Sequence, residues 1–331
     1  AATASGHVGR PSATVAPGEY TVLAVNPETT GVRVAIVGFG TQIRKQWYIP
    51  QEMPPTPDGL VEVVAHLVRD LQPQHMLGIG VAVPGVIETS SGTVRNAPHL
   101  GWRGEPVGER ISQVTGYPAY VINDAMAGAV GEWTFGYGRD TRDLVYLNGV
   151  SGIGGGVISH GKPHFGSTGA AGEYGHMVIR SGGRLCHCGR HGCFETEVSL
   201  SRLSEVLGRQ ATLEGLDEDL RAMRDPDALA EVSRQIDALI VAVANVCTIH
   251  DPELVVLGGY LGALYSLDPE RIRGAAHAAI LTPETRPIRF TRATDVATSV
   301  LLGAAELAYR PFLADPVGMV NALRETPFGL A

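Results

Sequence analysis

The chain has 331 residues, of which 44% are hydrophobic, 6% are aromatic and 42 are glycine. This composition is typical of an α/β protein, and the length is sufficient for two lobes of ordinary domain size. The formal net charge of −8 argues against nucleic-acid binding by this segment, because neutralising phosphates requires a basic face. Gly, Asp or Arg interrupts every apolar run, so we expect no membrane partner. Four cysteines without a visible signal peptide favour the reducing cytoplasm.

The start of the chain predicts a linker rather than a folded element. Residues 1–18 are mostly small and include several Pro and Gly, and the first residue is not Met. In chain order, two β-branched runs at 20–26 and 31–39 then predict a hairpin, to which residues 42–49 can add a third strand.

The next elements alternate between helix and strand. Asp58 is predicted to cap a helix that ends near Gln72. Its apolar positions lie on one helical face: Leu60, Val63, Val64, Leu67 and Leu71. A buried strand at 77–83, a helix opened by Pro106, a strand at 119–122 and a helix at 124–133 follow.

A similar order of elements recurs after Asp143, which indicates two halves of similar architecture. We expect strands at 144–150 and 153–159, a long helix at 232–249, a strand at 254–257, and helices at 269–281 and 298–313. Cys247 stands alone in the long apolar helix and is predicted to be a core residue.

The other three cysteines, Cys186, Cys188 and Cys193, lie within eight residues of one another. Three thiolates plus one imidazole are the ligands of a closed, tetrahedral structural zinc site. The alternative is a disulfide, but a Cys-x-Cys disulfide would close a strained loop, so the pattern favours zinc. On spacing alone His176, His187 and His191 are all candidates for the fourth ligand.

The pattern His-x9-Cys-x-Cys-x4-Cys, preceded by Glu-x-Gly and followed by Phe-Glu, resembles the zinc signature of the ROK family. This family comprises sugar kinases and sugar-responsive transcriptional repressors on an actin-like, hexokinase-like ATPase fold, and the resemblance extends over about residues 20–316. It implies that His176 is the fourth zinc ligand, with Cys186, Cys188 and Cys193, and that His176 also contacts the sugar.

The resemblance also implies the domain organisation. The expected fold is α/β with two lobes and a structural zinc loop. The first lobe covers residues 19–131 and is completed by a C-terminal helix at about 297–331, and the second covers 132–296 with the zinc loop at 176–195.

Several polar residues are candidates for binding a sugar between the lobes. Asp124 follows a predicted strand and begins a helix, so it could be only an N-cap. The resemblance instead implies that Asp124 binds sugar and, in a kinase, is the catalytic base, while Asn123 binds sugar. Glu173 and Glu195 could support the zinc loop, but the resemblance assigns both to the sugar, whose buried hydroxyls need partners.

The segment Asn96-Ala97-Pro98-His99-Leu100-Gly101-Trp102 resembles the family's Ala-Pro-Asn-Leu-Gly-Trp loop, in which the Asn reaches the sugar. His99 replaces that Asn, and an imidazole can still hydrogen-bond a hydroxyl. We therefore include Asn96 and His99 among the sugar-binding residues, and we expect Trp102 to be a core residue.

Two glycine-containing segments resemble nucleotide-binding motifs of the family. Ser151, Gly152 and Gly154 lie between two predicted strands and could form an ordinary hairpin turn, but they match the second phosphate loop. Gly258 and Gly259 follow a predicted strand and resemble the adenosine-side motif. Both motifs would bind nucleotide if that activity is retained.

The first phosphate loop departs from the family. Its kinases carry Asp-x-Gly-Gly-Thr-x-x-Arg between the first two strands, whereas this chain has Asn26-Pro27-Glu28-Thr29-Thr30-Gly31-Val32-Arg33. The acidic residue is an amide and both glycines are missing. A carboxylate at Glu28 would also repel phosphate. Asn26, Glu28, Thr29, Thr30 and Arg33 therefore predict a degenerate phosphate loop.

The leading hypothesis is the sugar-sensing and oligomerisation region of a ROK-type transcriptional regulator. The sugar would shift the closure of the lobes, and DNA would bind only through a module upstream of Ala1, because Gly9-Arg10-Pro11 resembles the segment that follows that module in ROK repressors. A homodimer or homotetramer is expected. The alternatives are an Mg-ATP-dependent kinase of a hexose or amino sugar, and a non-catalytic assembly protein that has lost sugar binding.

Overall fold

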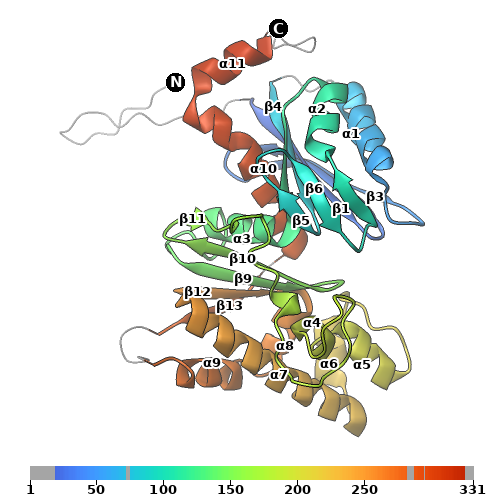
Figure 1. Cartoon of the computed structure of the whole chain (residues 1–331), viewed down its shortest axis with the longest axis vertical. Helices are drawn as coiled ribbons and strands as arrows, with labels where there is room; N and C mark the ends of the chain where they lie inside the picture. Colours follow the sequence, from blue (N-terminus) through green and yellow to red (C-terminus); the bar gives the residue numbers. More distant parts are fainter. Residues whose placement is uncertain (1–18, 72–74, 282–286, 294, 325–331) are drawn as a thin grey trace, which may run out of the picture.

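A computed structural model describes residues 19–71, 75–281, 287–293 and 295–324 of the chain. The predicted linker at 1–18, the predicted helix end at Gln72 and the last seven residues of the predicted C-terminal segment lie outside them. Two five-stranded sheets dominate the structure, each covered by helices, and a smaller sheet lies beside the first (Figure 1).

The first sheet has the strand order β3-β2-β1-β4-β8. It is composed of β1 (Thr21–Glu28), β2 (Gly31–Gly38), β3 (Ile43–Pro50), β4 (Met76–Val83) and β8 (Ala119–Asn123). The first three strands form the predicted antiparallel meander, and β4 and β8 add in parallel. Since β4 is buried along its whole length, this sheet has core on both faces.

Helix α1 (Pro57–Leu71) begins two residues earlier than predicted. The Thr56 hydroxyl accepts a hydrogen bond from the Gly59 N–H at 3.0 Å, so Thr56 caps the helix and the prediction for Asp58 is wrong. The buried face is also rotated from the predicted one and consists of Leu60, Val61, Val64, Ala65 and Val68. Helix α2 (Val107–Thr115) follows Pro106 as predicted and ends at Gly116 in the left-handed conformation.

A three-stranded sheet between β4 and α2 was not predicted. It consists of β5 (Val86–Glu88), β6 (Thr93–Ala97) and β7 (Trp102–Glu105). Trp102 is 2% exposed and donates its indole N–H to the Pro55 carbonyl at 2.8 Å, which confirms a core position. The turn between β6 and β7 carries His99.

The second sheet has the order β11-β10-β9-β12-β13. Its strands are β9 (Leu144–Gly149), β10 (Ile153–Ser159), β11 (Lys162–Pro163), β12 (Leu254–Gly258) and β13 (Arg289–Arg292). The helices of this half, in the lower part of Figure 1, are α4 (Phe194–Glu197), α5 (Leu200–Leu207), α6 (Leu216–Ala222), α7 (Pro226–His250), α8 (Gly259–Leu267) and α9 (Pro269–Ala278).

Helix α7 starts at Pro226, earlier than predicted, because the Asp225 carboxylate accepts the Ala228 N–H at 2.9 Å and caps it. By length and composition α7 could cross a membrane, contrary to the expectation that no run is long and apolar enough. One face of the helix lies in the core of the second half, where Cys247 is 2% exposed, as expected of a core helix in a globular protein.

Helices α3 (Asp124–Thr134) and α10 (Val296–Ala314) cross between the two sheets (Figure 1). Helix α10 lies against β1 and β4, and α3 lies against β9 and β10. The two helices touch backbone to backbone: a Cβ at Gly131 would lie 2.0 Å from the Ser299 carbonyl oxygen, and one at Gly303 would lie 1.8 Å from that of Ala127. This contact joins the two halves, and α11 (Pro316–Arg324) follows α10.

Candidate functional site

A cavity of about 640 Å³ contains all the residues predicted to bind sugar. They come from β6 and the turn after it, from the junction of β8 and α3, from the 3₁₀ turn η1 (Tyr174–His176) and the residue before it, and from α4. These lining residues are Asn96, His99, Asn123, Asp124, Glu173, His176 and Glu195. Segments from both halves of the fold therefore form one polar cavity.

Two adjacent residues at the junction of β8 and α3, Asn123 and Asp124, make different contacts. The Asn123 Oδ1 accepts the Met126 N–H at 2.9 Å and caps α3, and its Nδ2 donates to the Gly85 carbonyl at 2.9 Å. Asn123, and not Asp124, is therefore the N-cap, so the alternative reading of Asp124 as a mere cap is wrong. The Asp124 carboxylate accepts the Ala125 N–H at 2.8 Å and lines the cavity.

Asp124 is half-buried in the wall of the cavity, and its surroundings change its acidity. Burial raises the pKa of Asp124 to about 6, and the nearby Glu173 carboxylate adds to the shift while the Ala125 N–H opposes it. Burial also raises the pKa of Glu173. A carboxyl group that titrates near neutral pH can accept a proton from a hydroxyl, which is what a general base does.

Close backbone packing positions Glu173 and His176. Gly172 has a φ of +97°, and a Cβ there would lie 2.4 Å from the Gly155 carbonyl oxygen on β10. A Cβ at Gly175 would lie 2.2 Å from the Ile153 carbonyl oxygen. Residues 172–176 therefore pack closely against the backbone of β10. Gly175 leaves room for this contact, which explains the glycine of the Glu-x-Gly pattern.

The predicted zinc ligands converge on one point. The ligand atoms of His176, Cys186, Cys188 and Cys193 all lie within 4.8 Å of one another. Cys188 Sγ and Cys193 Sγ are 3.6 Å apart, and Cys186 Sγ is 3.5 Å from His176 Nδ1. Ligands of a tetrahedral zinc ion are separated by about 3.8 Å, so the donor set fits zinc. All three cysteines are free thiols, which rules out a disulfide among them in this structure.

A second group of donors overlaps the first. The ligand atoms of His176, Cys186, His187 and Glu195 also lie within 4.8 Å of one another. The Cys188 thiol favours the set with three cysteines, because a hydrogen bond from the Arg190 guanidinium lowers its pKa to about 6 and a thiolate is the form that binds metal.

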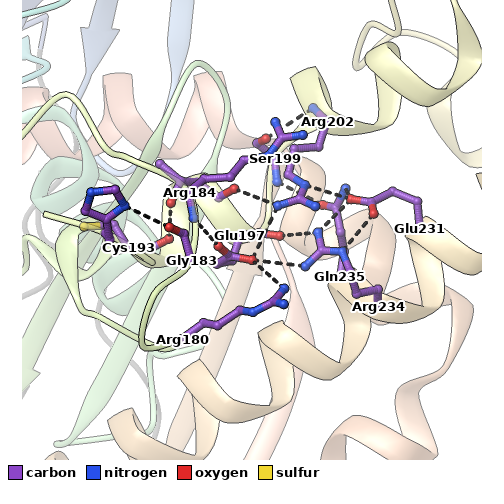
Figure 2. A network of polar contacts seen from close by, with 12 residues as sticks. Arg180, Gly183, Arg184, Cys193, Glu197, Ser199, Arg202, Glu231, Arg234 and Gln235 are labelled. Carbon is purple, nitrogen blue, oxygen red and sulfur yellow. Dashed lines mark hydrogen bonds and ion pairs between the residues drawn. The ribbon is translucent and has the colours of Figure 1, made fainter.

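A buried carboxylate anchors the end of the metal loop to the helices below it. Glu197 is 1% exposed and accepts hydrogen bonds from the Arg184 N–H at 3.1 Å, from Arg202 at 3.4 Å and from Arg234 at 3.3 Å. Arg180 adds an ion pair at 3.6 Å. Figure 2 shows these groups around Glu197, with Arg234 reaching it from α7.

The second phosphate-loop motif forms the turn between β9 and β10. Ser151, Gly152 and Gly154 line the sugar-side cavity, and Ser151 and Gly152 also line a neighbouring cavity of about 610 Å³. Tyr260, the first residue after Gly259, lines that second cavity, and its buried hydroxyl has no hydrogen-bond partner among the described residues.

The two glycines of the predicted adenosine-side motif connect β12 to α8. Gly258 precedes α8, and Gly259 has a φ of +57°. A Cβ at Gly259 would lie 2.1 Å from the Gly149 carbonyl oxygen. Gly259 therefore permits the close approach of α8 to the end of β9, and neither glycine lines the two cavities.

The first phosphate-loop motif forms a tight turn at Thr29 and Thr30 between β1 and β2. Arg33 binds the Glu28 carboxylate through both oxygens, at 2.8 and 3.3 Å, while Asn26 is buried and donates to the Ala82 carbonyl at 2.9 Å. None of these five residues lines either cavity. The charged side chains of this turn, Glu28 and Arg33, therefore neutralise each other.

Comparison with known proteins gives the same assignment. The profile of the ROK family matches residues 22–310 of the chain. The chain belongs to the ROK family. It is 36% identical over 218 residues to a xylose repressor from Caldicellulosiruptor bescii, and the match covers 61% of this chain and 54% of the repressor. The chain therefore spans about half of that regulator. It is 30% identical over 289 residues to a glucokinase from Streptomyces coelicolor, covering 80% and 89% of the two chains.

Solved structures of ROK proteins share the fold. A ROK glucokinase from Streptomyces griseus, solved with glucose and AMPPNP, has a TM-score of 0.75 at 27% identity and covers 88% of this chain and 99% of its own. A ROK transcriptional regulator, a homolog of the E. coli MLC protein, has a TM-score of 0.79 at 21% identity, covering 90% and 81%. These similarities confirm the predicted two-lobed, actin-like and hexokinase-like fold.

Sequence reasoning missed two parts of this ROK site. His187 was considered only as a rival metal ligand, but it lines the cavity. Glu197 was not singled out, because a lone Glu in a polar loop carries no pattern that predicts burial. One feature of the sequence points indirectly to the burial of Glu197: three arginines, at positions 180, 184 and 202, lie close to it in the chain.

Proposed function

We propose that this chain is the sugar-sensing, effector-binding and oligomerisation region of a ROK-type transcriptional regulator. The observation that carries this proposal is the β1–β2 turn, in which Arg33 holds Glu28 where the family's kinases would receive phosphate. The bound carboxylate would repel phosphate oxygens, and Asn26 donates its amide to the Ala82 carbonyl on β4 and lacks the carboxylate that would help to place magnesium. The sugar-side cavity is lined by all seven residues predicted to bind sugar.

The proposal includes a structural zinc ion held by His176, Cys186, Cys188 and Cys193, whose arrangement fits it. When bound, zinc would fix the loop that presents His176 and Glu195 to the sugar. We further propose that residues 19–131 with α10 form one lobe and 132–296 the other. The protein would act in the cytoplasm as a homodimer or homotetramer, and DNA would be bound by a module outside this chain.

A second candidate function is an ATP-dependent kinase of a hexose or amino sugar. It is favoured by the match to 89% of a glucokinase and by Asp124, whose pKa of about 6 suits a base that accepts the proton of a sugar hydroxyl. The open β9–β10 turn and the unpartnered Tyr260 hydroxyl fit a polar ligand such as a nucleotide. The β1–β2 turn does not fit Mg-ATP.

Calorimetric titration of Mg·ATP into the metal-loaded protein, alone and with a panel of sugars, tests the proposal. A saturable sugar signal without heat from ATP is expected. ATP binding that tightens with one sugar would support the kinase instead. Absence of binding by every sugar would reject both functions and favour an assembly protein.

A further inference from the structure

His187 lies between two of the proposed metal ligands but points to the sugar side. It lines the cavity, and 47% of its side chain is exposed there. Its Nδ1 is 3.1 Å from Glu195 Oε1. The zinc set with three cysteines does not use His187, so its second ring nitrogen is available to a ligand in the cavity.

Three imidazoles form a row along this wall of the cavity. The His187 ring meets the His176 ring edge-on at a centroid distance of 5.0 Å and the His99 ring at 5.9 Å. His176 and His187 come from the second half of the fold, whereas His99 comes from the β6–β7 turn of the first. The row therefore crosses from one half to the other.

His99 also closes the corner beside this row. A Cβ at Gly152 would lie 3.3 Å from His99 Nε2 and 3.1 Å from Glu195 Oε2, so the His99 ring reaches the β9–β10 turn. The two oxygens of Glu195 therefore have different surroundings: Oε1 accepts the Cys186 thiol at 3.0 Å and lies 3.1 Å from His187 Nδ1 and 3.4 Å from His176 Nδ1, whereas Oε2 lies at the corner that His99 closes.

We propose that His187 is a specificity-determining residue of the sugar site and acts as a pair with His99. This inference rests on the proposed sugar-binding function. Each neutral imidazole offers one donor and one acceptor, so the pair can bind two neighbouring hydroxyls on either side of the Glu195 carboxylate. Because the two rings fill this corner, the site favours a neutral pyranose with free hydroxyls over a sugar with a bulky acetamido group there.

The test compares the zinc-loaded wild type with His187→Ala, His187→Asn and His99→Asn, using glucose, xylose, mannose, N-acetylglucosamine and N-acetylmannosamine as probes. His191→Ala is the matched control, because His191 is in the same loop and contacts the Gly183 carbonyl at 3.0 Å outside the cavity. Zinc content and the far-ultraviolet circular dichroism spectrum are measured for every variant.

We expect the wild type to prefer an unsubstituted sugar and His187→Ala to weaken its binding at least about tenfold with zinc content unchanged. The preference over the acetamido sugars should also shrink, and His187→Asn should restore part of the affinity. His191→Ala should change neither property.

Loss of zinc from both His187→Ala and His187→Asn would show that His187 is a zinc ligand, and this result would overturn the inference. Unchanged affinity and ranking in a zinc-loaded His187→Ala protein would overturn it as well, and would leave the sugar-binding function intact. If the wild type binds none of the five sugars, the proposed function itself fails.

Discussion

The β1–β2 and β9–β10 hairpins hold corresponding positions in the two five-stranded sheets, but the contacts made by their turns differ. The β9–β10 turn contains Ser151 and Gly152, and both residues line the two cavities. In the β1–β2 turn, the Arg33 guanidinium binds both oxygens of the Glu28 carboxylate. The β1–β2 turn therefore contains its own ion pair, and Arg33 does not need a bound anion as its partner.

Under the proposed function, the chain would keep one half of the family's nucleotide site and would have lost the other half. An exposed turn of small residues can bind phosphate through its N–H groups, whereas an ion pair at a turn opposes phosphate by charge and by volume. The sugar side does not depend on β1–β2 residues. Sugar binding can therefore persist after the nucleotide side has changed.

The largest expected effect concerns the metal loop, which supports the intact side of this comparison. Cys188→Ser removes one of the four donors, and since metal binding contributes directly to the folding of such a loop, metal content should fall to background. Sugar affinity should fall more than about tenfold, or 1.4 kcal/mol. Elemental analysis and calorimetry measure the two quantities.

Cys247→Ala provides the control for the metal-loop experiment, because Cys247 is buried in α7 away from the donor set. It should keep its zinc. A Cys188→Ser protein that retained zinc and wild-type sugar affinity would show that the ligand assignment is wrong.

A second prediction concerns Asp124 and pH. Because the pKa of Asp124 is raised to about 6 in the folded state from 3.8, its burial costs no stability below about pH 4 and costs progressively more as pH rises through 6. The free energy of unfolding of the wild type should therefore fall, relative to Asp124→Asn, by at most about 3 kcal/mol over this range. Urea denaturation at pH 4, 5, 6 and 7 measures it.

The same variant separates stability from binding. Asp124→Asn should be at least as stable as the wild type at pH 7, yet bind sugar more weakly, because an amide replaces a carboxylate in the cavity. Parallel stability curves for the two proteins across this pH range would contradict the raised pKa.

A third prediction concerns substitutions that remove the Glu28–Arg33 ion pair from the β1–β2 turn. The triple variant Asn26→Asp, Glu28→Gly and Thr29→Gly restores the kinase-type residues, removes the carboxylate and returns both glycines. Affinity for Mg·ATP should increase at least about tenfold, or 1.4 kcal/mol, in calorimetric titrations. Glu28→Ala alone removes the charge without the glycines and should give a smaller gain. Equal, undetectable ATP binding in all three proteins would place the defect elsewhere.

The smallest expected effect concerns Gly152 in the β9–β10 turn. Gly152→Ala adds a methyl group 3.1 Å from Glu195 Oε2 and 3.3 Å from His99 Nε2. Both are ends of side chains that can move by a few tenths of an ångström, so sugar affinity should fall by only about threefold, less than 1 kcal/mol. Calorimetry with the preferred sugar of the wild type measures the change, and a loss as large as that of Cys188→Ser would show that the corner is rigid.

Motifs with fixed spacing were predicted well, because short-range patterns specify them directly. The closeness of the four proposed metal ligands, and the presence in one cavity of the residues predicted to bind sugar, follow from such motifs; whether they bind zinc and sugar stays a prediction. The N-cap assignments were less reliable: at α1 a threonine two residues before Asp58 caps the helix, and at α3 both Asn123 and Asp124 suit the position. The sheet of β5, β6 and β7 was missed because its strands are short and partly exposed.

Contacts between distant segments could not be read from the sequence. The pairing of Glu197 with Arg234 on α7 joins residues 37 positions apart. The raised pKa of Asp124 depends on how deeply the cleft buries it, and the meeting of His99 with His187 depends on the relative placement of the two halves. Each of these requires the tertiary structure.

The Glu197 anchor has a consequence for how the protein responds to metal supply. The guanidinium groups of Arg202 and Arg234 hold the end of the loop on α5 and α7 through Glu197, which is not one of the proposed metal ligands. Departure of zinc would therefore release the cysteine-containing turn but leave its neighbour Glu195 close to the cavity. Under the proposed function, loss of the metal would therefore be a local event that weakens sugar binding before it unfolds the protein.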